Sequence, residues 1–169
     1  MKLQALVFAT LALASPALAQ SAQDIERKEQ ELVAAWEKAP LTLRKAVFVT
    51  EKAPIYGSYS PRPNNTFKSG ETLLAYLEPV GYGWNQQGDS NLLGITLDVV
   101  LKGKDGKILG GQEKFLNYQQ ASRHKLRELM LNVTLTLGGT PPGEYQVEFV
   151  AKDLGGKSGS VTLPFTITE

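Results

Sequence analysis

The chain has 169 residues and nearly balanced charge, with 18 lysines and arginines against 17 aspartates and glutamates. A neutral surface exerts no long-range attraction on nucleic acid or on an anionic membrane, so we expect neither as a partner. Cysteine is absent, which excludes a disulfide, a cysteine nucleophile and a lipid-modified N-terminal cysteine.

Residues 1–19 have the pattern of a secretory signal peptide. Lys2 precedes an apolar run that ends at Leu13, and small residues at Ala17 and Ala19 indicate cleavage after Ala19. The run is too short to span a bilayer. The sequence therefore predicts an exported protein whose mature chain has no membrane span. An alanine-rich leader without cysteine favours the periplasm of a Gram-negative bacterium.

Residues 20–40 are predicted to form an N-terminal helix and a linker. The helix is expected over Ser21–Lys38, because this segment is rich in good helix formers, and Pro40 ends it. Leu32 and Trp36 fall on one face. Two interpretations stay open: the helix packs these side chains on the sandwich or serves as a spacer, or it forms a short coiled coil or docks on a partner.

Residues 41–169 show strand patterns throughout, with turn signals at the spacing of a β-sandwich. Ala53–Asn65 is rich in turns and proline, and Asp105-Gly106 predicts a type I′ hairpin. Seven or eight strands are expected, and the main ones are Arg44–Thr50, Phe67–Val80, Leu92–Gly103, Ile108–Tyr118, Glu128–Leu137 and the two strands of Pro141–Thr168.

The stretch Pro141–Thr168 has the clearest hairpin pattern. Apolar side chains alternate with polar ones along both of its strands, and a glycine-rich turn separates them. The apolar side chains predicted to face inward are Tyr145, Val147, Phe149 and Ala151 in the first strand and Val161, Leu163, Phe165 and Ile167 in the second. A hairpin alone is marginally stable in water, so these strands require a second sheet.

Two segments resemble immunoglobulin-like and fibronectin type III-like domains. FKSGETLLAYLE is similar to their second strand, and PPGEYQVEFVAKDLGGKSGSVTLPFTI is similar to their last two strands. The resemblance covers residues 41–169 and lacks the cysteine pair of antibody domains. It implies a mainly β fold: a single antiparallel immunoglobulin-like β-sandwich of seven to eight strands, preceded by one α-helix. Such domains have many unrelated functions, so the resemblance implies no functional residues.

Residues 81–89 form the first candidate binding site. Tyr82 and Trp84 lie between glycines beside Asn85, and aromatic faces with amide donors suit a sugar or a peptide. Tyr56 and Tyr59 of the other aromatic loop are expected to join them. The alternative is that Trp84 closes the end of the sandwich as a core residue.

Catalytic groups are scarce. His124 is the only histidine, and it lies in a basic segment, residues 123–127, that suits either an acidic partner or a solvated strand edge. A carboxylate pair of a hydrolase is conceivable between Glu78 and Asp98, if these lie on neighbouring strands. The sequence predicts no metal site, because one histidine and dispersed acidic residues do not make one, and no cofactor.

These observations favour a periplasmic interaction module without catalytic activity that binds another envelope protein through a loop end, a strand edge or the helix. The alternative function is a carbohydrate- or small-ligand-binding domain that uses the aromatic loop 81–89.

Overall fold

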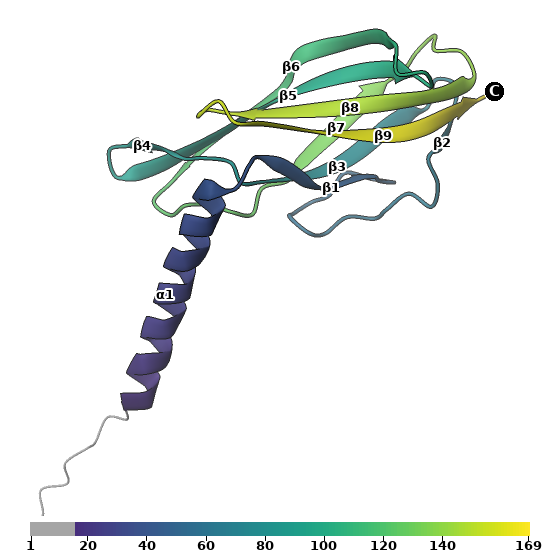
Figure 1. Ribbon diagram of the computed structural model, residues 1–169. Helices are drawn as coiled ribbons and strands as arrows, with labels where there is room; N and C mark the ends of the chain where they lie inside the picture. The colour runs from purple at the N-terminus through teal and green to yellow at the C-terminus, as the bar shows by residue number, and fades with distance from the viewer. Residues whose placement is uncertain (1–15) are drawn as a thin grey trace, which may run out of the picture. The chain divides into compact units, whose positions relative to one another are not determined.

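We describe residues 16–169 from a computed structural model of the protein (Figure 1). Residues 1–15, most of the predicted signal peptide, lie outside the described residues, so the signal peptide stays a prediction. Residues up to Ala34 and residues Ala35–Glu169 form two compact units, and each is described by itself.

The described residues contain one helix, α1 (Pro16–Lys38), which begins five residues before the predicted Ser21. Proline suits the first turn of a helix, because its missing N–H is one that no residue of the helix would bond. Within residues 16–169, no helix is long and apolar enough to cross a bilayer.

The side chains of residues 21–32 in α1 are exposed to solvent. Arg27 pairs with Asp24 at 3.0 Å and with Glu31 at 2.8 Å, both within one turn of the helix. Exposed pairs of this kind each contribute only about 0.3–0.5 kcal/mol. Ile25 and Leu32 are exposed.

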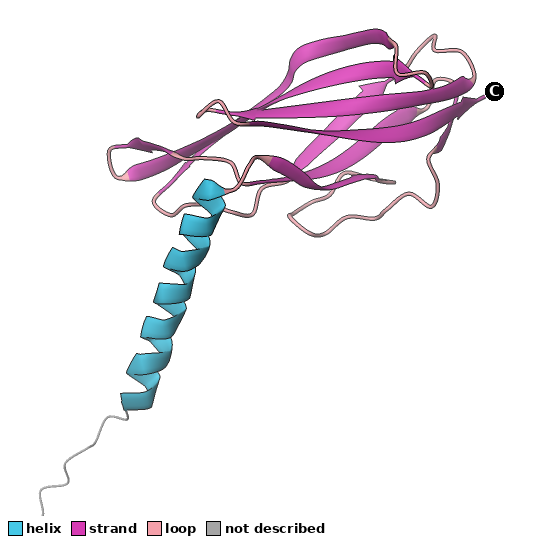
Figure 2. Ribbon diagram, viewed as in Figure 1, coloured by secondary structure: helices cyan, strands magenta, loops and turns pink. Residues whose placement is uncertain are grey.

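Nine strands follow among the described residues, and they make the protein mainly β (Figure 2). Seven are long, as predicted, and two contain only three residues. The strands are β1 (Thr42–Phe48), β2 (Thr66–Lys68), β3 (Thr72–Val80), β4 (Asn85–Gln87), β5 (Ser90–Gly103), β6 (Ile108–Ser122), β7 (Leu131–Thr136), β8 (Gly143–Asp153) and β9 (Ser158–Thr168).

The strands form two sheets of different width. The narrow sheet has the order β1-β3-β7. The wide sheet has six strands: β2-β9-β8-β5-β4 follow one another, and β6 also pairs with β5. All pairs are antiparallel except β2 with β9, which are parallel. In Figure 1 the two sheets lie in separate layers, with β5, β6, β8 and β9 in one and β1, β3 and β7 in the other.

One hydrophobic core lies between the sheets. It contains the inward side chains of β3 and β7 on one side and those of β5, β8 and β9 on the other. The alternation is plain in β3: Leu73, Ala75 and Leu77 face the core, while Tyr76 of the same strand packs in a second cluster on the outer face. A two-sheet β-sandwich is therefore the observed architecture.

The hairpin between β5 and β6 is confirmed, but its turn is not the predicted type I′. Such a turn needs positive φ at both central residues, and here Gly106 has φ 80° while Asp105 does not have positive φ. Gly106 N–H donates to Gly103 O at 3.0 Å, and Lys107 N–H donates to the Asp105 carboxylate at 3.1 Å. The loop is longer, and the aspartate stabilises it by a side-chain bond to the backbone.

Strand β6 contains a bulge. The pairing with β5 shifts between Leu97 and Val99, and Lys114 has φ 50°, which is unusual for a residue other than glycine. Asp98 of β5 stabilises this conformation, because its carboxylate accepts the Lys114 N–H at 2.8 Å and pairs with Lys152 at 2.6 Å. The bulge bends β6 in the middle of its length.

Candidate functional site

The predicted aromatic loop is anchored to the core. Tyr82 is fully buried, and its hydroxyl donates to Leu126 O at 3.1 Å. The indole N–H of Trp84 donates to the same oxygen at 3.0 Å. Burial raises the pKa of the Tyr82 hydroxyl well above its ordinary value. A wholly buried ring has no face for a ligand in this arrangement, so the structure gives no support to Tyr82 as a binding residue.

Trp36 completes an aromatic cluster with these two rings. Its ring centroid is 5.1 Å from that of Tyr82, at a nearly perpendicular angle, and 6.0 Å from that of Trp84. Its indole N–H donates to Tyr82 O at 2.8 Å. Each of the three rings thus has its polar group bonded, as buried tyrosine and tryptophan require. The alternative interpretation, in which Trp84 closes the end of the sandwich, agrees with this packing, and only Asn85 of this group is exposed, in β4.

Lys157 and Asp153 hold the chain around this cluster. The Lys157 ammonium donates to Glu37 O at 2.9 Å, to Ala39 O at 2.8 Å and to Gly81 O at 2.8 Å. The carbonyls at the end of a helix lack partners in the helix, and a cation there satisfies them. Asp153 accepts the N–H groups of residues 83, 155 and 157 at 2.8–2.9 Å. These two side chains stabilise the fold and leave no group free for a ligand.

The other two predicted tyrosines lie over the outer face of the narrow sheet. Tyr59 stacks on Tyr76, with ring centroids 4.4 Å apart, and Lys45 lies 5.5 Å above the Tyr59 ring. Tyr56 accepts a hydrogen bond from Arg44, and burial raises the pKa of the Tyr56 hydroxyl. Both tyrosines are half-buried. The described residues give no hydrogen bond or ring contact that joins this pair to Tyr82 and Trp84, so the structure does not bring the predicted residues into one site.

The proposed carboxylate pair is wrong. Glu78 is on β3, and its carboxylate bonds Tyr76 at 2.8 Å and Arg44 at 3.1 Å. Asp98 is on β5 in the other sheet, and its pKa is lowered, chiefly by the hydrogen bond from Lys152. On both strands the side chains that face the core belong to odd-numbered residues, whereas Glu78 and Asp98 are even-numbered. The two carboxylates therefore project from the outer faces of the two sheets, away from each other. Each carboxylate also has its own cation.

The basic segment 123–127 is partly structural. Lys125 pairs with Glu37 and lies 5.5 Å above the Trp84 ring, whereas Arg123 and His124 are exposed. Among residues 16–169, no group of three or more histidines, aspartates and glutamates is placed to hold a metal ion. The sequence-predicted groups therefore contribute mainly to packing.

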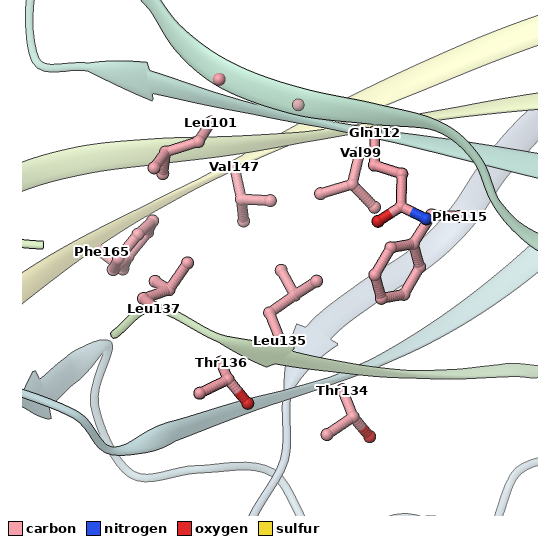
Figure 3. A pocket seen from close by; sticks show the side chains of 12 residues that line it. Val99, Leu101, Gln112, Phe115, Thr134, Leu135, Thr136, Leu137, Val147 and Phe165 are labelled. Carbon is pink, nitrogen blue, oxygen red and sulfur yellow. The ribbon is translucent and has the colours of Figure 1, made fainter. Parts of the chain in front are cut away.

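A site that the sequence did not indicate lies between the two sheets, where β6 and β7 leave the core open. It is an apolar cleft of about 280 Å³. Figure 3 shows apolar side chains of the wide sheet facing those of the narrow sheet across this space, while Thr134 and Thr136 point away from it. The apolar side chains that line the cleft are Val99, Leu101, Phe115, Leu135, Leu137, Val147 and Phe165.

The cleft is open because the narrow sheet has no strand opposite the first half of β6. Gly110 pairs with Leu101, and Gln112 pairs with Val99, so these residues are on the inner face of the sheet. Both are nevertheless exposed. A side chain at Gly110 would meet no atom within 4 Å. Since Phe115 is already half-buried, the core ends between Phe115 and Gly110.

Two free strand edges border the cleft. In the described sheets, β7 pairs only with β3, and β6 pairs only with β5. An edge strand presents unpaired N–H and C=O groups that can bond another chain. The open edge, which we define as β6, β7 and the cleft between them, therefore combines apolar surface with backbone hydrogen-bonding groups. The sequence indicated the inward side chains of β7, but no local pattern shows that a neighbouring strand is missing.

Comparisons with known proteins give no family. No protein-family model matches the chain, and no curated protein matches its sequence. Among solved structures, the sporulation control protein Spo0M from Bacillus subtilis is similar with a TM-score of 0.42 and 12% sequence identity, over 78% of this chain. The chain spans 50% of the Spo0M chain. Superoxide reductase (neelaredoxin) from Ignicoccus hospitalis is similar with a TM-score of 0.35 and 12% identity, over 75% of this chain and 82% of that one. Similarity at this level assigns neither a family nor an activity.

Proposed function

We propose that the protein is exported to the periplasm of a Gram-negative bacterium and acts there as an interaction module that binds another envelope protein without catalysing a reaction. The open edge is the proposed binding surface. The signal-peptide pattern of residues 1–19 supports the location. The observation that carries the binding function is the apolar cleft between two free strand edges.

The groups that the sequence predicted as sites offer less for recognition. The side chains of the predicted aromatic site are engaged in packing, with Tyr82 buried and Trp84 bonded to Leu126. Glu78 and Asp98 are each neutralised by a cation. In contrast, the cleft of the open edge is lined by core side chains, of which Leu101, Phe115 and Leu137 are only half-buried. Apolar surface next to unpaired backbone is typical of interaction sites.

The test compares what binds to the intact chain and to two variants. Gly110→Leu places an apolar side chain in the cleft, and Gln119→Leu adds the same side chain to the outer face of β6 as a matched control. Each carries a C-terminal affinity tag, is crosslinked in the native envelope and is purified. We expect a near-stoichiometric protein that the intact chain and Gln119→Leu capture and that Gly110→Leu loses.

Two results would contradict the proposal. Recovery of the intact chain alone would mean that it binds no envelope protein. Equal capture by all three proteins would mean that the binding surface is elsewhere. Thermal unfolding of both variants checks that a loss of capture does not result from a loss of folding.

A further inference from the structure

We infer that the partner contributes an extended segment that adds to β7 as a fourth strand of the narrow sheet and places apolar side chains at alternate positions in the cleft, with acidic residues at its C-terminal end. This inference rests on the proposed function and specifies the chemistry of the partner. Four observations lead to it.

The widths of the sheets determine where a strand is missing. Three strands face six, and the uncovered inner face belongs to the first half of β6, beside β7. A strand next to β7 would lie about 4.8 Å farther along the narrow sheet and would cover this surface. A strand added to β6 would only widen the wide sheet and leave the cleft uncovered.

The two free edges also differ in regularity. The bulge at Lys114 interrupts β6, and a bulge disfavours pairing along the edge where it lies. Six residues of β7, Leu131–Thr136, pair with β3 in one unbroken register. A regular edge offers evenly placed N–H and C=O groups to a new strand, so β7 is the better template.

The size and lining of the cleft fit side chains of a peptide. Sites for small molecules usually have about 300–1,000 Å³ and enclose most of the ligand. The cleft has about 280 Å³ and is not fully enclosed. It suits a few aliphatic side chains on a strand, whose alternate residues point to the same face. Gly110 leaves room for these side chains on the opposite wall.

Both pairs of the narrow sheet are antiparallel, so we expect an antiparallel added strand, and charge gives the chemistry of its end. The segment that leads into β7 carries Arg123, Lys125 and Arg127 against Glu128. Lys125 pairs with Glu37, and the described residues give no ion pair to Arg123 or Arg127. A strand antiparallel to β7 would end beside this segment. Acidic residues at its C-terminal end would therefore meet two arginines without a carboxylate partner.

A single strand of about six residues buries less than the roughly 800 Å² per partner of a stable interface. We therefore expect weak, reversible binding. Backbone bonds to β7 supply affinity, and the cleft supplies selectivity for apolar side chains at alternate positions.

The experiment selects peptides on the tagged full chain from a display library of random decapeptides. We expect enriched sequences with apolar residues at every second position, followed by aspartate or glutamate. An enriched peptide is then synthesised with and without N-methyl groups on the amides of one edge. N-methylation of the edge that faces β7 is expected to weaken binding at least tenfold, and N-methylation of the other edge is expected to change it less than twofold.

Variants and hydrogen exchange locate the peptide. Gly110→Leu and Gln112→Trp both fill the cleft and should each reduce binding at least tenfold, and Gln119→Leu should not change it. Amide exchange of residues 131–136 should slow in the complex. Arg127→Gln should weaken peptides with an acidic end and leave matched neutral peptides unchanged.

Enriched sequences with helical spacing, no enrichment at all, or equal binding of the N-methylated peptides would each overturn the inference. A concentration-dependent dimer of the free protein that Gly110→Leu abolishes would show that a second copy occupies the edge, and this would also overturn it. If the envelope partner is still lost with Gly110→Leu while no alternating peptide binds, the proposed function stands and only the added strand fails.

Discussion

The two lateral edges of the sandwich contain similar residues but differ in what covers them. At the closed edge, β2 pairs with β9, and Phe67 is buried against Phe48 and Phe165 with ring centroids 5.2 and 6.0 Å away. At the open edge, Phe115 is half-buried and Gln112 is exposed, although both are on an inner strand face.

The difference arises from one covering segment. Residues 49–65 cross the outer face of the narrow sheet and reach β9, where the Asn65 side chain donates to Pro164 O at 2.8 Å. Asn132 fixes the same segment through two bonds to the backbone of Ala53. Residues 123–130 join β6 to β7, but none of them lines the cleft. Chain connectivity, and not the apolar content of the strands, determines which edge stays available to a partner.

Two equivalent substitutions measure this difference most directly. Phe67→Ala at the closed edge should lower the free energy of unfolding by about 3–5 kcal/mol, because it leaves a cavity in a packed core. Phe115→Ala at the open edge should cost about 1 kcal/mol, because a half-exposed ring loses only part of its burial energy. Urea unfolding followed by tryptophan fluorescence gives both values. Equal losses would mean that the open edge is packed like the closed one.

A pair of glycines gives the next largest effect. A Cβ atom at Gly159 would lie 2.1 Å from Leu41 O. Gly159→Ala therefore pushes the backbone of β9 away from the backbone of Leu41. We expect a loss of about 2–3 kcal/mol. The methyl group of Gly110→Ala meets open space. This variant should be more stable than the intact chain by about 0.5 kcal/mol, because alanine lowers the conformational entropy of the unfolded state. Thermal unfolding of the two variants checks the signs, and a stabilising Gly159→Ala would show that the two strands are not in close contact.

Removal of the amide that holds the covering segment should have a moderate effect. The Asn132 side chain donates to Ala53 O at 2.8 Å and accepts the Ala53 N–H at 3.0 Å, and Ala53 is buried. Asn132→Ala leaves both backbone groups without partners and should cost about 2 kcal/mol. Amide exchange of residues 51–60 should accelerate. If Asn132→Ala lowers the stability equally but leaves the amide exchange of residues 51–60 unchanged, Asn132 stabilises the sheet and not the covering segment.

The effect of the β6 bulge should depend on pH. The lowered pKa of Asp98 means that its contribution is fully present above about pH 4, the ordinary range of an aspartate, and is lost as pH falls through the lower pKa of the folded state. Asp98→Asn should cost about 1.5 kcal/mol at pH 7, since a hydrogen bond to a charged group is lost while the half-exposed Lys152 is screened by solvent. The difference from the intact chain should shrink toward pH 2. Glu113→Gln, on the exposed part of β6, is the control, and a cost for Asp98→Asn that does not vary with pH would contradict the assignment.

Much of the fold could be predicted because strands record their environment locally. Leu131, Val133 and Leu135 alternate with polar residues, and all three are buried. The helix and the hairpin between β8 and β9 follow from equally local patterns. Predicted boundaries were less accurate: β7 ends before Leu137, which instead lines the cleft.

The candidate site was less predictable, because binding depends on what lies opposite a residue. Tyr82 is in a loop between glycines, a context in which a ring can be exposed or buried. Its burial depends on contacts with distant residues such as Trp36 and Leu126. Glu78 and Asp98 seemed to be a pair only while their strands could be neighbours.

The sequence by itself determined the seven long strands, the inward faces of several of them and the helix that precedes them, because the period of apolar side chains reflects burial on one face. The tertiary structure alone decided which strands are edges, which aromatic rings are enclosed and where the core stays open. These properties depend on contacts between residues far apart in the chain, since a strand has the same alternation whether its neighbour is a strand of its own protein, solvent or a partner.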